Sequence, residues 1–250
     1  MIDLKPTAWQ PNDVVKEILG HSHSDFVSLA CVSKQFNALT TLMAKQCPPR
    51  GSFGKVQWEK HGAKVGEEPP MIPISLKLYQ DCAKGLFMCT FIPETINEEL
   101  LTISSIDRFV SERKGVKKSN YRYPLALFGI GNDSVKKFKG HWVILAKEVL
   151  EGTRDEKFDV QKDKVEKSGF EVPELIDTIV SLLMHNLSTG EFIYPDASKG
   201  QKWTYTRVQE ENSSGFKIIV GGFSASGLHV GSYYGDGSIG VACARRSIGN

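Results

Sequence analysis

The sequence predicts an α+β protein, with a short helical N-terminal segment followed by a larger mixed domain. Three observations support this. Residues 8–45 have three short apolar stripes at helical spacing, and residues 173–187 have one long stripe. After residue 203, short apolar runs alternate with glycine-rich breaks. We expect a helical segment over residues 1–47, a Pro/Gly-rich linker and entry segment over 48–74, and an α+β domain over 75–250.

Three short helices are predicted in residues 8–45. Pro11 fits the first turn of a helix, where a missing N–H costs nothing, and apolar residues follow it at helical spacing. A second helix, capped near Asp25, and a third, opened at Ser33, have similar stripes. Helices this short cannot each bury a stripe alone, so we expect them to pack on one another and on a partner.

The linker and the first half of the large domain have clear local signals. Pro-Pro and Pro-Gly clusters favour extended backbone in the linker, whereas Phe53, Val56 and Trp58 predict that it docks on the domain. The apolar runs 86–93 and 141–146 predict buried strands. Residues 100–109 could form a strand or a helix, and the apolar spacing of residues 103–110 favours a helix. A mostly exposed helix is predicted over 157–167 and a short strand over 192–194.

The central element of the large domain is a predicted helix over residues 173–187. Pro173 is expected in its first turn and Gly190 just beyond its end, which are the preferred places for these residue types. Its apolar stripe runs the full length. We therefore expect this helix to pack in the core.

The C-terminal part predicts an antiparallel meander. Its expected strands are 203–208, 216–220, 227–230 and 239–245, separated by breaks at 212–215, 221–222 and 235–237. The last strand has apolar or small residues on both faces until Arg245, so it is predicted inside a sheet rather than at its edge. Its small face is expected to let the central helix approach closely.

The composition excludes several classes of protein. The net charge is +2, from 31 basic and 29 acidic residues, which argues against nucleic acid or a membrane surface as partner. No run approaches about 18 apolar residues. The 5 cysteines show neither disulfide nor zinc spacing, which predicts free thiols in a reducing compartment. We expect a cytoplasmic monomer without a cofactor or metal.

The N-terminal segment resembles an F-box. The match runs from a proline and an acidic residue through an Ile-Leu pair to a Val-Ser-Lys-x-Phe stretch. Gln10 stands where the family has leucine, and the turn of residues 20–24 lacks the usual apolar residue. The matching residues are Pro11, Asp13, Val14, Val15, Ile18, Leu19, Asp25, Phe26, Leu29, Ala30, Val32, Ser33, Lys34, Phe36 and Leu39.

This resemblance implies a function. An F-box segment binds a Skp-type adaptor of a cullin–RING ubiquitin ligase, and the remainder of the chain presents a recognition domain to a target protein. The protein itself would then catalyse nothing. The residues implied at the adaptor face are Pro11, Val14, Val15, Ile18, Leu19, Phe26, Leu29 and Val32.

A looser resemblance covers about residues 140–246, which look like a C-type-lectin-like domain of the branch shared with formylglycine-generating enzymes. The features that support this resemblance are Gly169-Phe-Glu-Val-Pro173 opening a helix, Trp203-Thr-x-Thr, and Gly240-Val-x-Cys243-x-Arg245. The calcium-binding motifs and paired cysteines of those families are absent, so neither calcium-dependent sugar binding nor that catalysis is implied. Similar modules follow F-box-like segments in proteins of intracellular bacteria, which would place an exported effector in the host cytosol.

Signals for chemistry are weak. His21 and His23 have no third ligand nearby, and Gly129-Ile-Gly131 lacks the third glycine of a dinucleotide loop. Gly222-Phe-Ser224-Ala-Ser226 is one residue from a nucleophile elbow but has no helix after it. Tyr205, Tyr233 and Tyr234 are the candidate target-binding residues.

Two functions therefore stay open. The first is the F-box-like substrate receptor. The second is a small-ligand-binding or enzymatic lectin-like module in which the N-terminal helices are a structural cap.

Overall fold

The structure, a computed structural model, describes residues 48–71, 74–112, 119–121, 139–195, 204–233 and 239–247. The chain divides into two units, Met1–Thr41 and Leu42–Asn250, and every described residue belongs to the second. The described part is α+β, as predicted, with mainly antiparallel sheets. The predicted N-terminal helices lie outside the described residues.

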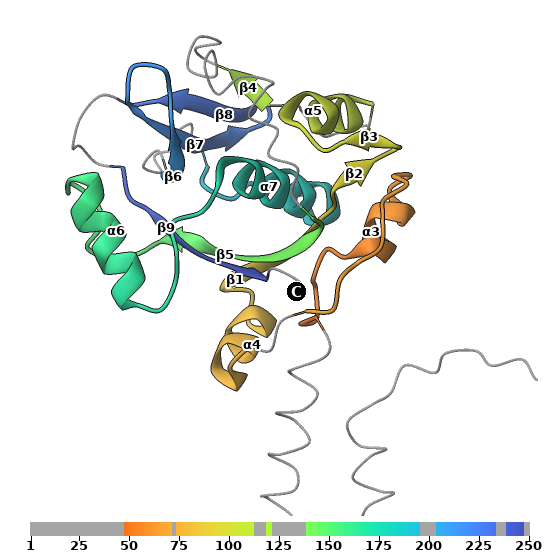
Figure 1. The fold of residues 1–250 in the computed structure, drawn as a ribbon, viewed down its shortest axis with the longest axis horizontal. Coiled ribbons are helices and arrows are strands. Elements are labelled where there is room, and N and C mark those ends of the chain that lie inside the picture. The colour runs from red at the N-terminus through yellow and green to blue at the C-terminus, as the bar shows by residue number, and fades with distance from the viewer. Residues whose placement is uncertain are drawn as a thin grey trace, which may run out of the picture. The chain divides into compact units, whose positions relative to one another are not determined.

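The first sheet has the strand order β1-β5-β9 and is antiparallel throughout. Its strands are β1 (Phe87–Ile92), β5 (His141–Val149) and β9 (Ala242–Ser247). Apolar runs predicted β1 and β5 as buried strands, and residues 88–92 and 141–146 are buried. In Figure 1 this sheet lies between helix α7 (Leu175–Thr189) and helix α4 (Leu76–Ala83).

The second sheet has the order β4-β8-β7-β6. It consists of β4 (Ser119–Tyr121), β6 (Tyr205–Glu211), β7 (Lys217–Ser224) and β8 (Gly227–Ser232). Strands β6, β7 and β8 pair antiparallel in chain order, as a meander does, whereas β4 pairs parallel to β8. Three of the four strands predicted for the meander thus form it.

Helix α7 (Leu175–Thr189) lies between the two sheets. Figure 1 shows it above the first sheet and below the second. Residues 177–184 are buried without a break, and this run includes the polar Asp177, Thr178 and Ser181, so α7 buries more than its apolar stripe. Its C-cap is Gly190 with φ 75°, as predicted, whereas Pro173 precedes the N-cap residue Glu174 instead of standing in the first turn.

Strand β9 is a correction to the predicted meander. It joins the first sheet beside β5 and forms its edge, so it lies neither in the meander nor inside a sheet. The prediction that both its faces are buried is confirmed. Val241 and Cys243 pack in a cluster with Val165 of helix α6 (Phe158–Lys167), whereas Ala242 and Ala244 join the main core.

Two backbone contacts explain how an edge strand stays buried. Ala244 exchanges two 2.9 Å hydrogen bonds with Glu171, which covers the outer side of β9. Just before β9, the Arg207 N–H donates to the carbonyl of Gly240 at 3.1 Å. The strand therefore connects the first sheet to β6 of the second.

The residues predicted as a linker are part of the core. Phe53 forms a parallel bridge with Thr90 of β1, and Trp58 in α3 (Lys55–Lys60) is fully buried and donates to the carbonyl of Phe91 at 2.9 Å. Val56 is exposed, so it contributes nothing to this docking. Helix α4 (Leu76–Ala83) follows, with Ser75 as its N-cap.

Three further elements complete the domain. The hairpin of β2 (Thr95–Ile96) and β3 (Glu99–Leu100) precedes α5 (Ile103–Ser111), which Thr102 caps. Helix α6 (Phe158–Lys167) is mostly exposed, as predicted, and buries only Gln161 and Val165.

Two predictions were wrong: the break between strands at residues 221–222 and the short strand over residues 192–194. Gly221 and Gly222 lie inside β7 instead of ending a strand, and the register shifts next to them as in a β-bulge. Residues 192–194 form no strand. Tyr194 has a left-handed backbone with φ 53°, and only the following Pro195 makes a bridge, to Phe223.

Candidate functional site

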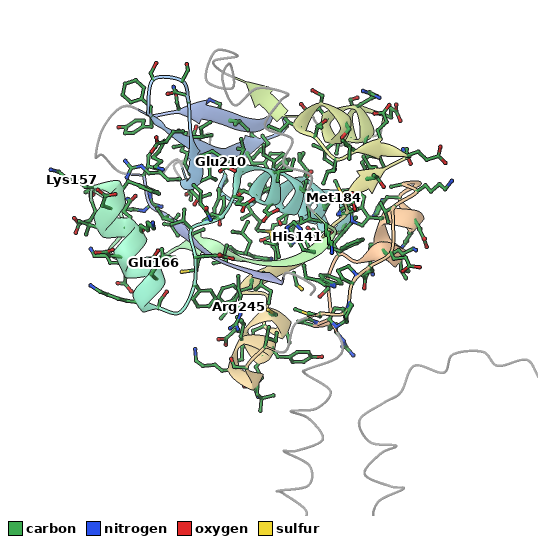
Figure 2. The ribbon with its side chains drawn as sticks, viewed as in Figure 1. His141, Lys157, Glu166, Met184, Glu210 and Arg245 are labelled. Atoms are coloured by element: carbon green, nitrogen blue, oxygen red, sulfur yellow. The ribbon has the colours of Figure 1, made fainter. Side chains whose placement is uncertain are left out.

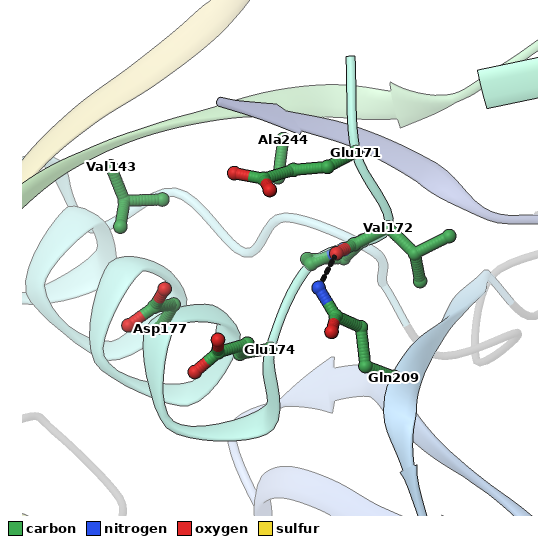
Figure 3. Close-up of a pocket in the computed structure, with 8 residues that line it drawn as sticks. Val143, Glu171, Val172, Glu174, Asp177, Gln209 and Ala244 are labelled. Carbon is green, nitrogen blue, oxygen red and sulfur yellow. Dashed lines mark hydrogen bonds between the residues drawn. The ribbon is translucent and has the colours of Figure 1, made fainter. Parts of the chain in front are cut away.

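A small pocket lies where the chain enters helix α7 (Figure 3). Its cavity is ≈ 10 Å³, close to the lower limit for one water molecule. A cavity of this size has no room for an organic ligand. The lining residues are Val143, Glu171, Val172, Pro173, Glu174, Asp177, Gln209 and Ala244.

The backbone around this pocket is held from both sides. Glu171 pairs with Ala244 of β9, and the Gln209 N–H of β6 donates to the carbonyl of Pro173 at 3.0 Å. The side-chain amide of Gln209 also donates to the carbonyl of Val172 at 2.6 Å, the bond drawn in Figure 3. The entry to α7 is therefore fixed between the two sheets.

The N-terminus of α7 is occupied by a carboxylate of the protein. The Leu175 N–H donates to both oxygens of Glu210, at 3.0 and 2.9 Å. Burial raises the pKa of Glu210; the bond from Leu175 opposes this, whereas the nearby carboxylates of Glu174 and Asp177 reinforce it. Because Glu210 takes the position where a helix binds an anion, an external anion would have to displace it.

Three residues of the pocket have carboxylates, which are common metal ligands. Glu171, Glu174 and Asp177 all line it. In the part of the chain that the structure describes, however, no group of three or more His, Cys, Asp or Glu side chains is placed to hold a metal ion. One of these acidic residues, Asp177, instead pairs with a buried histidine.

This histidine, His141, is the first residue of β5 (Figure 2). Its Nε2 lies 3.0 Å from Oδ1 of Asp177, and its Nδ1 lies 3.0 Å from the carbonyl oxygen of Lys139. The two side chains of the pair are 3% and 4% exposed. With both ring nitrogens engaged, His141 has no nitrogen left to act as a general base on a substrate.

The candidate target-binding tyrosines differ in exposure. Tyr233, after β8, is 37% exposed, so its ring is accessible to a partner. Tyr205 is 7% exposed, and its hydroxyl lies 2.9 Å from Nδ1 of His229. Tyr205 is therefore a core residue that offers little surface to a target. Tyr234 lies outside the described residues.

The predicted adaptor-binding residues, from Pro11 to Val32, all lie outside the described residues. The same holds for His21, His23 and the Gly129–Gly131 loop. Ser224 is the last residue of β7 and Ser226 lies in the turn before β8, with their hydroxyls 2.8 Å apart. A strand, not a helix, follows this turn, so the geometry of a nucleophile elbow is absent here.

Sequence reasoning missed a buried polar network between α6 and β6. The Arg207 side chain donates to Oε1 of Gln161 at 2.6 Å and to the carbonyl of Glu156 at 3.1 Å. Gln161 in turn donates to the carbonyl of Ile239 at 2.7 Å. A charged residue in an alternating strand is normally predicted to be exposed. No local signal therefore indicates that Arg207 is buried, with only 2% exposure.

A second missed group lies on the surface at the end of α7. Glu191 accepts from Lys147 of β5 at 2.9 Å and lies 2.8 Å from Nε2 of His185. These two partners lower the pKa of Glu191, whereas burial is the main reason why the pKa of His185 is lowered. The neighbouring Phe192 is 38% exposed. This group joins the end of α7 to the first sheet.

Comparison with family models, curated proteins and solved structures gave no match for this chain. Within the described ranges, no helix is both long and apolar enough to cross a membrane.

Proposed function

We propose that this protein is an F-box-like substrate receptor. Residues 8–45 would bind a Skp-type adaptor of a cullin–RING ubiquitin ligase, and the α+β domain, lectin-like over about residues 140–246, would present a surface to a target protein. The observation behind this proposal is the run from Pro11 to Leu39, where the apolar positions and the Val-Ser-Lys-x-Phe stretch follow the F-box pattern.

The described domain supports a role in protein recognition over one in small-molecule chemistry. The pocket at α7 has a volume suited to one water molecule, and His141, which pairs with Asp177 of that pocket, has both ring nitrogens engaged. Surface residues such as Tyr233 remain available for contact with a macromolecule. In this proposal the ubiquitin chemistry belongs to the ligase, and the protein acts in the cytoplasm, or in the host cytosol if it is an exported bacterial effector.

The adaptor face would consist of one apolar stripe. Val14, Ile18 and Leu19 share a helical face in the sequence, and an exposed apolar face of this kind marks an interface. A charged residue introduced into this stripe would have to enter the interface unpaired, which costs binding free energy. The full set proposed for this face is Pro11, Val14, Val15, Ile18, Leu19, Phe26, Leu29 and Val32.

The test is a pull-down of the full chain with a purified eukaryotic Skp-type adaptor. We expect the wild type to bind. The control Lys16→Asp, on the polar side of the same predicted helix, should also bind. The double variant Ile18→Asp, Leu19→Asp should lose binding while the melting of the α+β domain stays unchanged. Binding retained by the double variant, or none by the wild type, would contradict the proposal.

A further inference from the structure

Helix α6 buries little of its surface. Of its 10 residues only Gln161 and Val165 are buried, whereas most of the 15 residues of α7 are. Figure 1 shows α6 beside β9, outside the space between the two sheets that α7 fills. The free energy needed to open an element locally falls with the apolar surface that the element buries. Helix α6 should therefore open more readily than α7.

The polar contacts of α6 are ones that water can replace. Gln161 donates to the carbonyl of Ile239 at 2.7 Å and accepts from the Arg207 side chain at 2.6 Å. Arg207, which is 2% exposed, also donates to the carbonyl of Glu156 at 3.1 Å. Bonds to water would take the place of these bonds at little net cost, and the guanidinium would regain solvent. The polar contacts thus position α6 more than they stabilise it.

A glycine with a left-handed backbone stands on each side of α6. Gly152 has φ 73° and Gly169 has φ 81°. A Cβ atom at either position would meet nothing within 4 Å, so the space around both glycines is open. A few loop residues of this kind can take up the change in backbone direction when a segment swings out. The geometry therefore allows residues 153–168 to move as one piece.

Helix α6 covers an apolar strip of the first sheet. Val165 of α6 packs in a cluster with Ala146, Val172, Val241 and Cys243. This cluster is separate from the main core, which contains the buried apolar residues of α7. Removing Val165 from the cluster would uncover the strip and leave the packing of the main core in place.

We propose that residues 153–168 form a detachable cover over Val241 and β9, which opens as one unit while α7 and both sheets stay folded. The open form exposes the side chains of Val172, Val241 and Cys243. The cover therefore controls when this apolar strip meets solvent. The device is separate from the proposed adaptor binding, which involves residues 8–45.

Hydrogen exchange of the full-length protein tests this proposal. The amides of α6 should exchange at least about a hundredfold faster than those of α7, with little dependence on low guanidinium, because a local opening exposes little surface. Ile179→Val, at a fully buried position of α7, should speed exchange in α7 about two- to tenfold and leave exchange in α6 unchanged. Equal protection of the two helices, or an equal response of both to Ile179→Val, would overturn the proposal.

The thiol of Cys243 distinguishes the opening of the cover from fraying of α6 in place. In a Cys31→Ser, Cys47→Ser variant, Cys243 should be labelled at a lower guanidinium concentration than Cys82 and Cys89, which lie in the main core. If all three thiols become reactive at the same concentration, α6 does not uncover β9 and the proposal is wrong, however fast its amides exchange.

Discussion

The hydroxyl of Tyr205 on β6 lies 2.9 Å from Nδ1 of His229 on β8, although β7 runs between these two strands. Tyr205 pairs with Gly221, and Gly221 pairs with His229, so the three positions form a row across the sheet. The ring can cross β7 only because that strand has glycines here. A Cβ atom on Gly222 would lie 2.5 Å from the Tyr205 hydroxyl.

This relationship predicts the cost of a methyl group at Gly222. Gly222 has φ 55° and Gly215 has φ 79°, so alanine is strained at both positions, by about 1–2 kcal/mol. A Cβ at Gly215 would meet nothing within 4 Å, whereas one at Gly222 meets the buried Tyr205. Overpacking adds about 1–3 kcal/mol, so Gly222→Ala should be clearly less stable than Gly215→Ala in urea unfolding. Equal losses for the two variants would show that Tyr205 does not occupy this space.

The carboxyl of Glu210 at the start of α7 predicts a pH dependence. Its folded pKa is raised, mainly by burial, so the folded state binds its proton more tightly than the unfolded chain does. The protein therefore loses stability as the pH rises from the ordinary glutamate pKa of about 4.3 through the raised pKa of Glu210. Glu210→Gln, which imitates the protonated form, should match the wild type at pH 4 and exceed its stability at pH 7.

Glu166→Gln is the control for this experiment, because Glu166 lies on α6 with a side chain 54% exposed. The stability of Glu166→Gln should equal that of the wild type at every pH. If Glu210→Gln is less stable than the wild type at pH 7, the bonds from Leu175 outweigh the burial of the carboxylate. The raised pKa would then be wrong.

The buried thiols predict slow chemical labelling. Burial raises the pKa of Cys82 and of Cys89 to about 12, and it also raises the pKa of Cys243. Only the thiolate reacts, and at pH 9 a thiol with a pKa of about 12 is ionised to about one part in a thousand. In a Cys31→Ser, Cys47→Ser variant, the three thiols should stay unlabelled at pH 9 until guanidinium is added.

The labelling of Cys243 also tests the position of β9. Cys243 lies on the face of β9 that packs toward α6. Rapid labelling of Cys243 in the native protein would mean that this face is open, and that the contact between Glu171 and Ala244 does not cover the edge of the sheet.

The sequence by itself determined the elements whose signal is local. An apolar run of strand length gave β1 and β5, and helical spacing gave α5 and α7. The apolar stripe along residues 173–187 also predicted that α7 would pack in the core. These features follow from side-chain direction and solvent avoidance along a few consecutive residues, which do not depend on the rest of the fold.

Only the tertiary structure decided how these elements pair. The small and apolar faces of β9 show that it is buried, but both sheets offer such a place, and β9 joins β5 instead of the meander. The role of Gly222 depends on the ring of Tyr205, which arrives from another strand. The same holds for His141 and Asp177, which are 36 residues apart. Periodicity fixes the face that a residue presents, whereas its partner across the core is set by long-range packing, which no local pattern records.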